Sequence, residues 1–94
     1  MNEEMSIELL EANHTFPGPY LFKVIGRSER GFVARVVAAV RDELAADVDP
    51  PYRVRESEGG RHVSVSLEPT VQTGRQVLEV YRRIRQTAGL VILW

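Results

Sequence analysis

The sequence predicts an α+β fold in which four strands and two helices follow one another in the order βαββαβ. Three observations predict it: two stretches with the apolar spacing of helices, four short stretches typical of strands, and turn residues between them. Ninety-four residues are enough for one domain with its own core. No repeat or linker divides the chain, so we expect a single domain over residues 16–94 and an N-terminal extension over residues 1–15.

Residues 20–25 predict the first strand, because they are dense in aromatic and β-branched residues. The prolines in residues 16–19 favour extended backbone and end any helix in the extension. Alternation places Tyr20, Phe22 and Val24 on one face and Leu21, Lys23 and Ile25 on the other. We expect Gly26 to end the strand.

The two helices share one spacing of apolar residues, at positions i, i+3, i+4, i+7 and i+11. The first stripe is Val33, Val36, Val37, Val40 and Leu44, and the second is Val77, Val80, Tyr81, Ile84 and Ala88. Ser28 is the expected cap of the first helix. Thr73 and Gln76 form the expected capping box of the second, and Gly89 is its expected C′ residue.

Residues 52–57 and 62–68 alternate in the manner of strands, and two glycines lie between them at Gly59 and Gly60. Glycine tolerates the positive φ that tight turns require, so the pattern predicts a β-hairpin. Residues 91–94 predict a short last strand, and its terminal Trp94 is expected to anchor packing.

Each helix has one apolar stripe, and right-handed crossovers place both helices on the same side of the sheet. The sheet therefore has a covered face and an open face. The covered face would carry Phe22, Val24, Tyr52, Val54, Val63, Val65 and Leu67. The open face would carry Leu21, Lys23, Ile25, Arg53, Arg55, His62, Ser64 and Ser66. This arrangement is a ferredoxin-like sandwich, with a four-stranded antiparallel sheet and two helices on one face.

Several segments resemble the YbeD-like family, small bacterial proteins of unassigned function. Leu9-Leu10 and the run FPGPYLFKVIG at residues 16–26 resemble the family's leucine pair and F-P-x-x-F/Y-x-F/Y-K-V-x-G strand. Residues 62–67 resemble its H-S-V-S-I strand, with one extra residue, and Gln76-Val77 with Tyr81 resemble its second helix. The resemblance covers about residues 9–94. It implies a ferredoxin-like domain akin to the ACT regulatory domains, which bind small effectors, and it implies no reaction.

Composition excludes some classes of function. The chain has no cysteine, which excludes disulfides and thiolate chemistry and suits a reducing compartment. The first residues lack the basic start of a secretory signal, and no apolar run approaches the ~20 residues that span a bilayer, so we expect a cytoplasmic protein with no membrane contact. The net charge is −1, with nine acidic and five basic residues in 1–49 against four acidic and seven basic residues in 50–94.

The first candidate site is the loop before the first helix, with Gly26, Arg27, Ser28 and Arg30 as ligand-binding residues. Backbone N–H groups at a helix start attract anions, and two arginines could clamp a small anionic effector. A helix entry that needs a cap and two flexible glycines explains the same residues without a ligand.

The loop also suggests an enzyme, because acylphosphatases share the βαββαβ order and a glycine-rich loop with an arginine. Residues 31–35 faintly resemble that loop. Their mechanism needs an asparagine near the hairpin, however, and this chain has only Asn2 and Asn13. Two histidines without cysteine fall short of a zinc site, and no nucleophile or carboxylate pair is recognisable. We therefore expect no catalytic residue, metal or cofactor.

The second candidate site is a partner surface on the open face, formed by Lys23, Arg53, Arg55, His62, Ser64 and Ser66. RNA-recognition domains stack bases on exposed aromatic residues of such a face, whereas this chain has Ser64 and Ser66 at those positions. Basic residues without a stacking platform make a poor single-strand site. The pattern favours a protein partner or a second copy over nucleic acid, and a plain solvated surface is the remaining interpretation.

Overall fold

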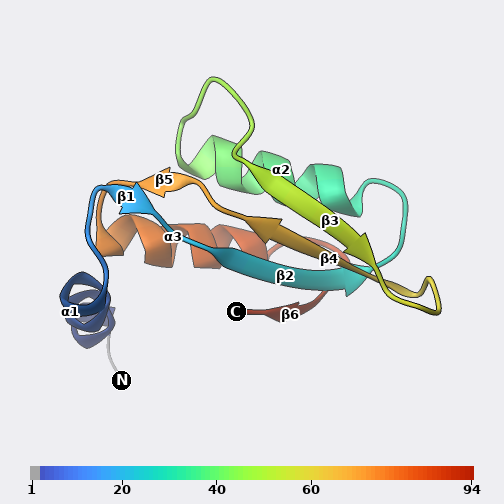
Figure 1. The fold of residues 1–94 in the computed structure, drawn as a ribbon, viewed down its shortest axis with the longest axis horizontal. Coiled ribbons are helices and arrows are strands. Elements are labelled where there is room, and N and C mark those ends of the chain that lie inside the picture. The colour runs from blue at the N-terminus through green and yellow to red at the C-terminus, as the bar shows by residue number, and fades with distance from the viewer. Residues whose placement is uncertain (1–2) are drawn as a thin grey trace.

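Over its described residues, the protein is an α+β structure with three helices and two antiparallel sheets (Figure 1). The computed structural model describes the backbone of residues 3–94 and the side chains of residues 6–94. In chain order the elements are α1 (Glu3–Asn13), β1 (Gly18–Pro19), β2 (Phe22–Arg27), α2 (Phe32–Glu43), β3 (Tyr52–Glu56), β4 (His62–Leu67), β5 (Thr70–Val71), α3 (Gly74–Arg85) and β6 (Leu90–Leu93).

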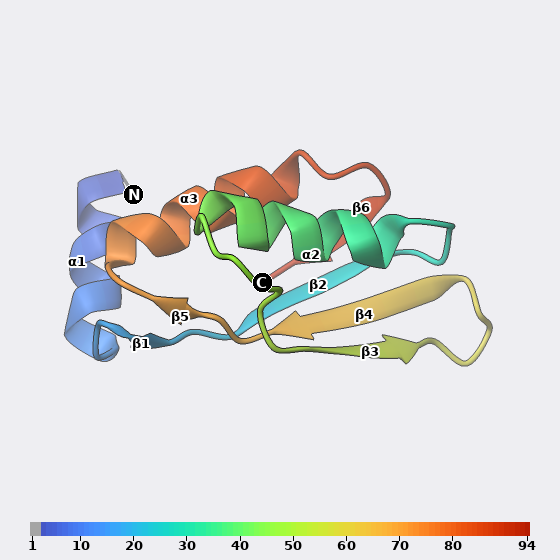
Figure 2. The same cartoon turned by 90° about the horizontal axis from the view of Figure 1, so that it is seen from above.

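Four strands form the larger sheet, in the order β3-β4-β2-β6, and every neighbouring pair is antiparallel. Helices α2 and α3 lie side by side on one side of this sheet, and the other side is left uncovered (Figure 2). The two central strands pair from Phe22 opposite Leu67 to Arg27 opposite His62. Both helices, the hairpin and the last strand are therefore present in the predicted order.

The core lies between the helices and the sheet. Periodicity placed most of it correctly, because alternate residues of β2 and β4 and the stripes of α2 and α3 supply it. Its fully or almost fully buried apolar members are Phe22, Val24, Phe32, Val36, Val37, Val40, Val63, Val65, Leu67, Val71, Val77, Val80 and Ile84.

The start of α2 differs from the prediction because of Phe32. Gly26 does not end β2 but lies inside it, buried, and a Cβ added there would overlap the Phe32 ring. Glycine is the residue that leaves room for this ring. Gly31, with φ of 87°, is the N-cap of α2, so the expectation that Ser28 caps this helix is wrong.

Tyr52 and Val54 were expected to be buried, and they are not. Val54 pairs with buried Val65, so it lies on the helix side of the sheet as predicted, yet it is 46% exposed. The reason is position: β3 is an edge strand, and all five of its residues are exposed. Alternation fixes which face a residue shares, but a neighbouring helix must still reach that residue to bury it.

The N-terminal helix is longer than the helical turn that Ile7, Leu9 and Leu10 suggest, and the second sheet was not predicted. Helix α1 packs against α3, where a Cβ on Gly74 would lie 3.3 Å from Cβ of Leu10, so glycine there allows the close approach. Strands β1 and β5 form a two-stranded sheet, with Gly18 opposite Val71. Each strand has only two residues, which is too short for an alternation pattern, and β1 also contains a proline, so the sequence pattern missed both.

Helix α3, the second of the two predicted helices, begins as predicted but ends at a different residue. The side chain of Thr73 accepts a hydrogen bond from the Gln76 N–H at 3.1 Å, and the Gln76 side chain accepts one from Gln72 rather than from Thr73. The C-cap is Gln86, so Gly89 is not at C′. With φ of 94°, Gly89 instead forms the turn into β6.

Candidate functional site

The open face of the larger sheet brings together all six residues of the predicted partner surface. In the pairing of β2, β4 and β3, Lys23 lies opposite Ser66, which lies opposite Arg53. Ser64 likewise lies opposite Arg55 in β3, and His62 opens β4. Residues that are directly opposite in a ladder share a face, so these side chains form one surface across three strands.

The cations of this surface have no partner within the part of the chain whose side chains are described. Arg53 and Arg55 make no ion pair or side-chain hydrogen bond there, and neither does Lys23, whereas Arg35, Arg41 and Arg83 are all paired with carboxylates. Unpaired arginines in neighbouring positions leave hydrogen-bond donors and charge available for an acidic group.

The surface is hollowed at both ends of the sheet. One hollow, of about 330 Å³, is lined by Ile25, Arg55, Glu56, Ser57, Glu58, His62, Val63 and Ser64. The other, of about 440 Å³, is lined by Leu21, Lys23, Pro51, Tyr52, Arg53, Ser66 and Glu68. Together they include every residue of the predicted partner surface. Their shallow, open shape suits contact with a macromolecule better than enclosure of a small ligand.

Strand β6 adds an apolar part to the open face that sequence reasoning missed. Ile92 lies opposite Ile25, and the Trp94 backbone exchanges two hydrogen bonds with Lys23, at 2.8 and 2.9 Å. Ile92 is 49% exposed and Trp94, which was expected to anchor packing, is 51% exposed. The alternation of residues 90–94 indicates that Ile92 and Trp94 share a face. Which face of the sheet this is depends on the register of β6 against β2, which the sequence does not give.

The first candidate site is the loop after β2, and several of its main-chain N–H groups already donate hydrogen bonds within the protein. The N–H groups of Arg27 and Ser28 donate to the carbonyls of Gly89 and Arg61, each at 2.9 Å, and the Glu29 N–H donates to Arg27. Gly26 is buried in β2, while Arg27, Ser28 and Arg30 are exposed. Several amides that could hold an anion are thus engaged within the fold. Binding of an effector at these residues stays a prediction.

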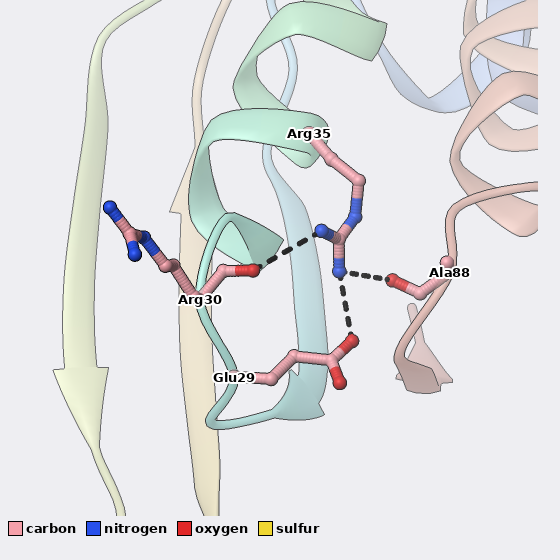
Figure 3. Close-up of polar contacts among 4 residues, drawn as sticks. All are labelled: Glu29, Arg30, Arg35 and Ala88. Atoms are coloured by element: carbon pink, nitrogen blue, oxygen red, sulfur yellow. Dashed lines mark hydrogen bonds and ion pairs between the residues drawn. The ribbon is translucent and has the colours of Figure 1, made fainter.

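In the comparison with acylphosphatases, Arg35 corresponds to the arginine that holds phosphate. Here its guanidinium instead forms hydrogen bonds within the protein and joins two loops. Its Nη2 donates to Oε1 of Glu29 at 2.8 Å and to the Ala88 carbonyl at 3.0 Å (Figure 3). Its Nη1 donates to the Arg30 carbonyl at 3.3 Å, while its Nε is buried without a partner. This arrangement fastens the α3–β6 turn to the entry of α2. Of the two asparagines, Asn2 lies outside the described residues, and Asn13 donates to the Leu9 carbonyl in α1.

Aromatic residues gather where the N-terminal segment meets β2 and α3. The Tyr20 ring lies 5.0 Å from those of His14 and Phe22, and the Phe22 ring lies 5.0 Å from that of Tyr81. The Tyr81 hydroxyl lies 3.4 Å from that of Tyr20, and burial, followed by this contact, raises the pKa of Tyr81 above its ordinary value. The Phe16, Tyr20, Phe22 and Tyr81 positions that carried the family resemblance are thus packing positions.

The described residues form neither a metal-binding cluster nor a membrane-spanning helix. Among residues 6–94, no three histidine, aspartate or glutamate side chains converge as metal ligands would. No helix within residues 3–94 has the length and apolar character needed to cross a membrane. The open face is therefore the surface that the described structure distinguishes best.

These features define a small α+β protein with an exposed, partly basic sheet face. The family described as "Protein of unknown function (DUF493)" matches residues 11–93, so this chain belongs to that family. The relatives agree: a UPF0250 protein of Shewanella woodyi is 34% identical over 83 residues, which cover 88% of each chain. A UPF0250 protein of Shewanella oneidensis is 30% identical over 83 residues, which again cover 88% of each chain. The resemblance to YbeD-like bacterial proteins is confirmed.

A solved structure resembles the fold. Protein HP0495 from H. pylori, determined in solution, superposes with a TM-score of 0.67 and 13% sequence identity, over 86% of this chain and 85% of that one. At this identity the likeness concerns the fold alone. It supports the α+β arrangement and carries no information on a ligand.

Proposed function

We propose that this protein is a non-catalytic binding module that recognises a protein partner through the open face of its larger sheet. The module is of the ferredoxin-like, ACT-related kind, and its strand order and its two helices on one side support that description. The cysteine-free composition suits work in the cytoplasm. The observation that carries the proposal is the open face itself, which combines exposed apolar residues with two arginines that have no partner among the described residues.

The chemistry of this face fits a protein partner. Leu21, Ile92 and Trp94 are each about half exposed on or beside it, and they offer apolar area for burial. Arg53 and Arg55 in β3 lie next to Ser66 and Ser64 in β4, at the edge of the sheet. There they can bind carboxylates of a partner. Tryptophan and arginine are the residues that most often dominate the binding energy of protein interfaces.

A comparison of variants tests the proposal. Immobilised wild-type protein, an Arg53→Glu/Arg55→Glu double variant and a Trp94→Ser variant are exposed to nuclease-treated lysate of the native bacterium. We expect both variants to lose the proteins that the wild type retains, with thermal midpoints within a few degrees of the wild-type value, because the altered side chains are exposed. An Arg75→Glu/Arg82→Glu variant on the exposed surface of α3 is the matched control.

The control should retain every partner, since it changes charge equally on another surface. If the open-face variants retain the same proteins as the wild type, the open face is a solvated surface and the proposal fails. If partners are lost only when the loop residues Arg27 and Arg30 are changed, the binding site is the loop before α2.

Weak nucleic-acid binding is the second candidate, and Trp94 is the observation that favours it. Trp94 supplies the stacking surface that Ser64 and Ser66 do not, and it lies beside Lys23 on the open face. Binding of a labelled single-stranded oligonucleotide should then weaken steeply with salt. The double arginine variant should flatten that dependence by about one phosphate contact per arginine. Absence of binding at low salt would remove this candidate.

A further inference from the structure

The free edge of β3 is a second feature of the sheet that the open-face proposal does not use. All five residues of this strand are exposed, and no strand within residues 3–94 pairs with its outer side. The flanking hydrogen bonds show which groups point outward. The Glu68 N–H donates to the Pro51 carbonyl at 3.0 Å, and the Ser57 N–H donates to the His62 carbonyl at 2.9 Å.

Between these two bonds the register of β3 and β4 has no shift. Main-chain groups in an antiparallel ladder point alternately to one neighbour and to the other. Arg53 and Arg55 therefore direct their N–H and C=O groups toward β4, whereas Tyr52, Val54 and Glu56 direct theirs to the free edge. These three alternate residues offer their main-chain N–H and C=O groups to an incoming strand.

The side chains of β3 specify what that strand should carry. Arg53 and Arg55 project from the open face and have no carboxylate partner among the described residues. On the other face, Val54 is 46% exposed opposite buried Val65. A strand with alternating acidic and apolar residues would place acids opposite the arginines and an apolar residue beside Val54.

Charge argues against a second copy of this chain at the same edge. A two-fold axis centred on residue 53, 54 or 55 would place an arginine of one copy directly opposite an arginine of the other. Like charges directly opposite are unfavourable, and charged edge residues are a known means of preventing edge-to-edge association. The same arginines that repel a second copy attract an acidic strand.

We infer that an extended segment of another protein, with alternating acidic and apolar residues, adds to β3 as a fifth strand of the sheet. Main-chain hydrogen bonds to Tyr52, Val54 and Glu56 supply the attachment, and the arginines supply selectivity for acidic side chains. Strand addition at an exposed sheet edge is an established mode of peptide recognition.

Synthetic peptides test this inference without knowledge of the natural partner. The probe is a seven-residue, end-blocked peptide of alternating glutamate and valine, titrated into ¹⁵N-labelled protein. We expect the amide signals of Tyr52, Val54 and Glu56 to shift and their hydrogen exchange to slow. A lysine–valine peptide of the same length should bind at least tenfold more weakly, and the Arg53→Glu/Arg55→Glu variant should reverse this preference.

Two further measurements separate strand addition from simple charge attraction. A glutamate–valine peptide that is N-methylated on the residues facing β3 keeps its charges but loses its main-chain donors, so it should not bind. Val54→Pro removes the matching donor of the protein, and proline is tolerated on strand edges. The methylated peptide leaves the protein unchanged, so the inference remains testable even if Val54→Pro does not fold.

The outcomes are distinct from those of the open-face test. Binding of the methylated peptide, shifts confined to β6 or the helices, or no binding at millimolar peptide would overturn strand addition. A dimer that dissociates on dilution and is lost in Val54→Pro would show that a second copy occupies the edge. Loss of cellular partners in Trp94→Ser with full retention in Val54→Pro would support the open face and contradict the edge.

Discussion

The two faces of the larger sheet are built from the same strands and differ in almost every other property. On the covered face, Phe22, Val24 and Val65 are fully buried beneath α2 and α3. On the open face, Lys23 and Arg53 are exposed, although each is only one residue away from a residue of the other face. The difference teaches that alternation divides the residues between the faces, and that the helices decide which face becomes the core.

A second difference lies within the covered face itself. Val65 in central β4 and Val54 in edge β3 lie directly opposite each other, yet one is fully buried and the other is about half exposed. Helix α2 contacts β4, whereas all five residues of the edge strand β3 stay exposed. Burial therefore falls from the centre of the sheet to its edge even where the residue type is the same, and this gradient leaves β3 available for binding.

The largest expected effect compares neighbours on opposite faces. Phe22→Ala should lower the free energy of unfolding by about 3–5 kcal/mol, because it removes a fully buried ring and leaves a cavity. Lys23→Ala should change it by no more than about 0.5 kcal/mol, since this side chain is exposed and has no partner among the described side chains. Urea denaturation measures both. Equal losses would contradict the assignment of the two faces.

A smaller effect is expected at Gly26, where β2 makes room for Phe32. Gly26→Ala should destabilise the protein by about 1–3 kcal/mol, because the new methyl group would overlap the Phe32 ring. Gly59→Ala in the hairpin turn is the control, since nothing lies within 4 Å of the added atom. Adding Phe32→Leu to Gly26→Ala should cost less than the sum of the two single changes. Additive costs would show that the two residues do not compete for space.

The pair Val65 and Val54 tests the gradient from centre to edge. Val65→Ala should lower the free energy of unfolding by about 1–3 kcal/mol, whereas Val54→Ala should lower it by less than about 1 kcal/mol. Both remove the same two methyl groups from opposite positions in one ladder. A cost at Val54 equal to that at Val65 would mean that β3 is covered in solution.

The smallest effect concerns alkaline pH and the Tyr81 hydroxyl on the covered side. Burial raises the pKa of Tyr81, whereas in the unfolded chain its pKa is near the ordinary 10.0. The unfolded state therefore loses its proton first, and the free energy of unfolding should fall as the pH rises above about 10. Below that pH this residue adds no pH dependence. In Tyr81→Phe the decline should be shallower, as measured by urea denaturation between pH 8 and 11, and an identical decline would contradict the assignment.

Local sequence patterns determined α2, α3, the four strands of the larger sheet and the division of that sheet into two faces. The stripes of α2 and α3, the hairpin glycines and the alternation of β4 each depend on neighbours within a few residues, so they can be recognised without knowledge of the tertiary structure. For the same reason the six residues of the predicted partner surface were named correctly as one face. The family resemblance, from residues 9–94, was likewise available from the sequence.

Only the tertiary structure decided what depends on distant contacts. The exposure of Val54 follows from the place of β3 at the edge, and the exposure of Trp94 on the open face follows from the register of β6. The buried position of Gly26 requires Phe32, and the role of Gly89 requires the turn into β6 and the approach of Glu29. None of these contacts leaves a periodic pattern, because each joins segments whose pairing is fixed by packing rather than by local spacing. Strand order and register therefore decided where the open face is apolar and which edge is free.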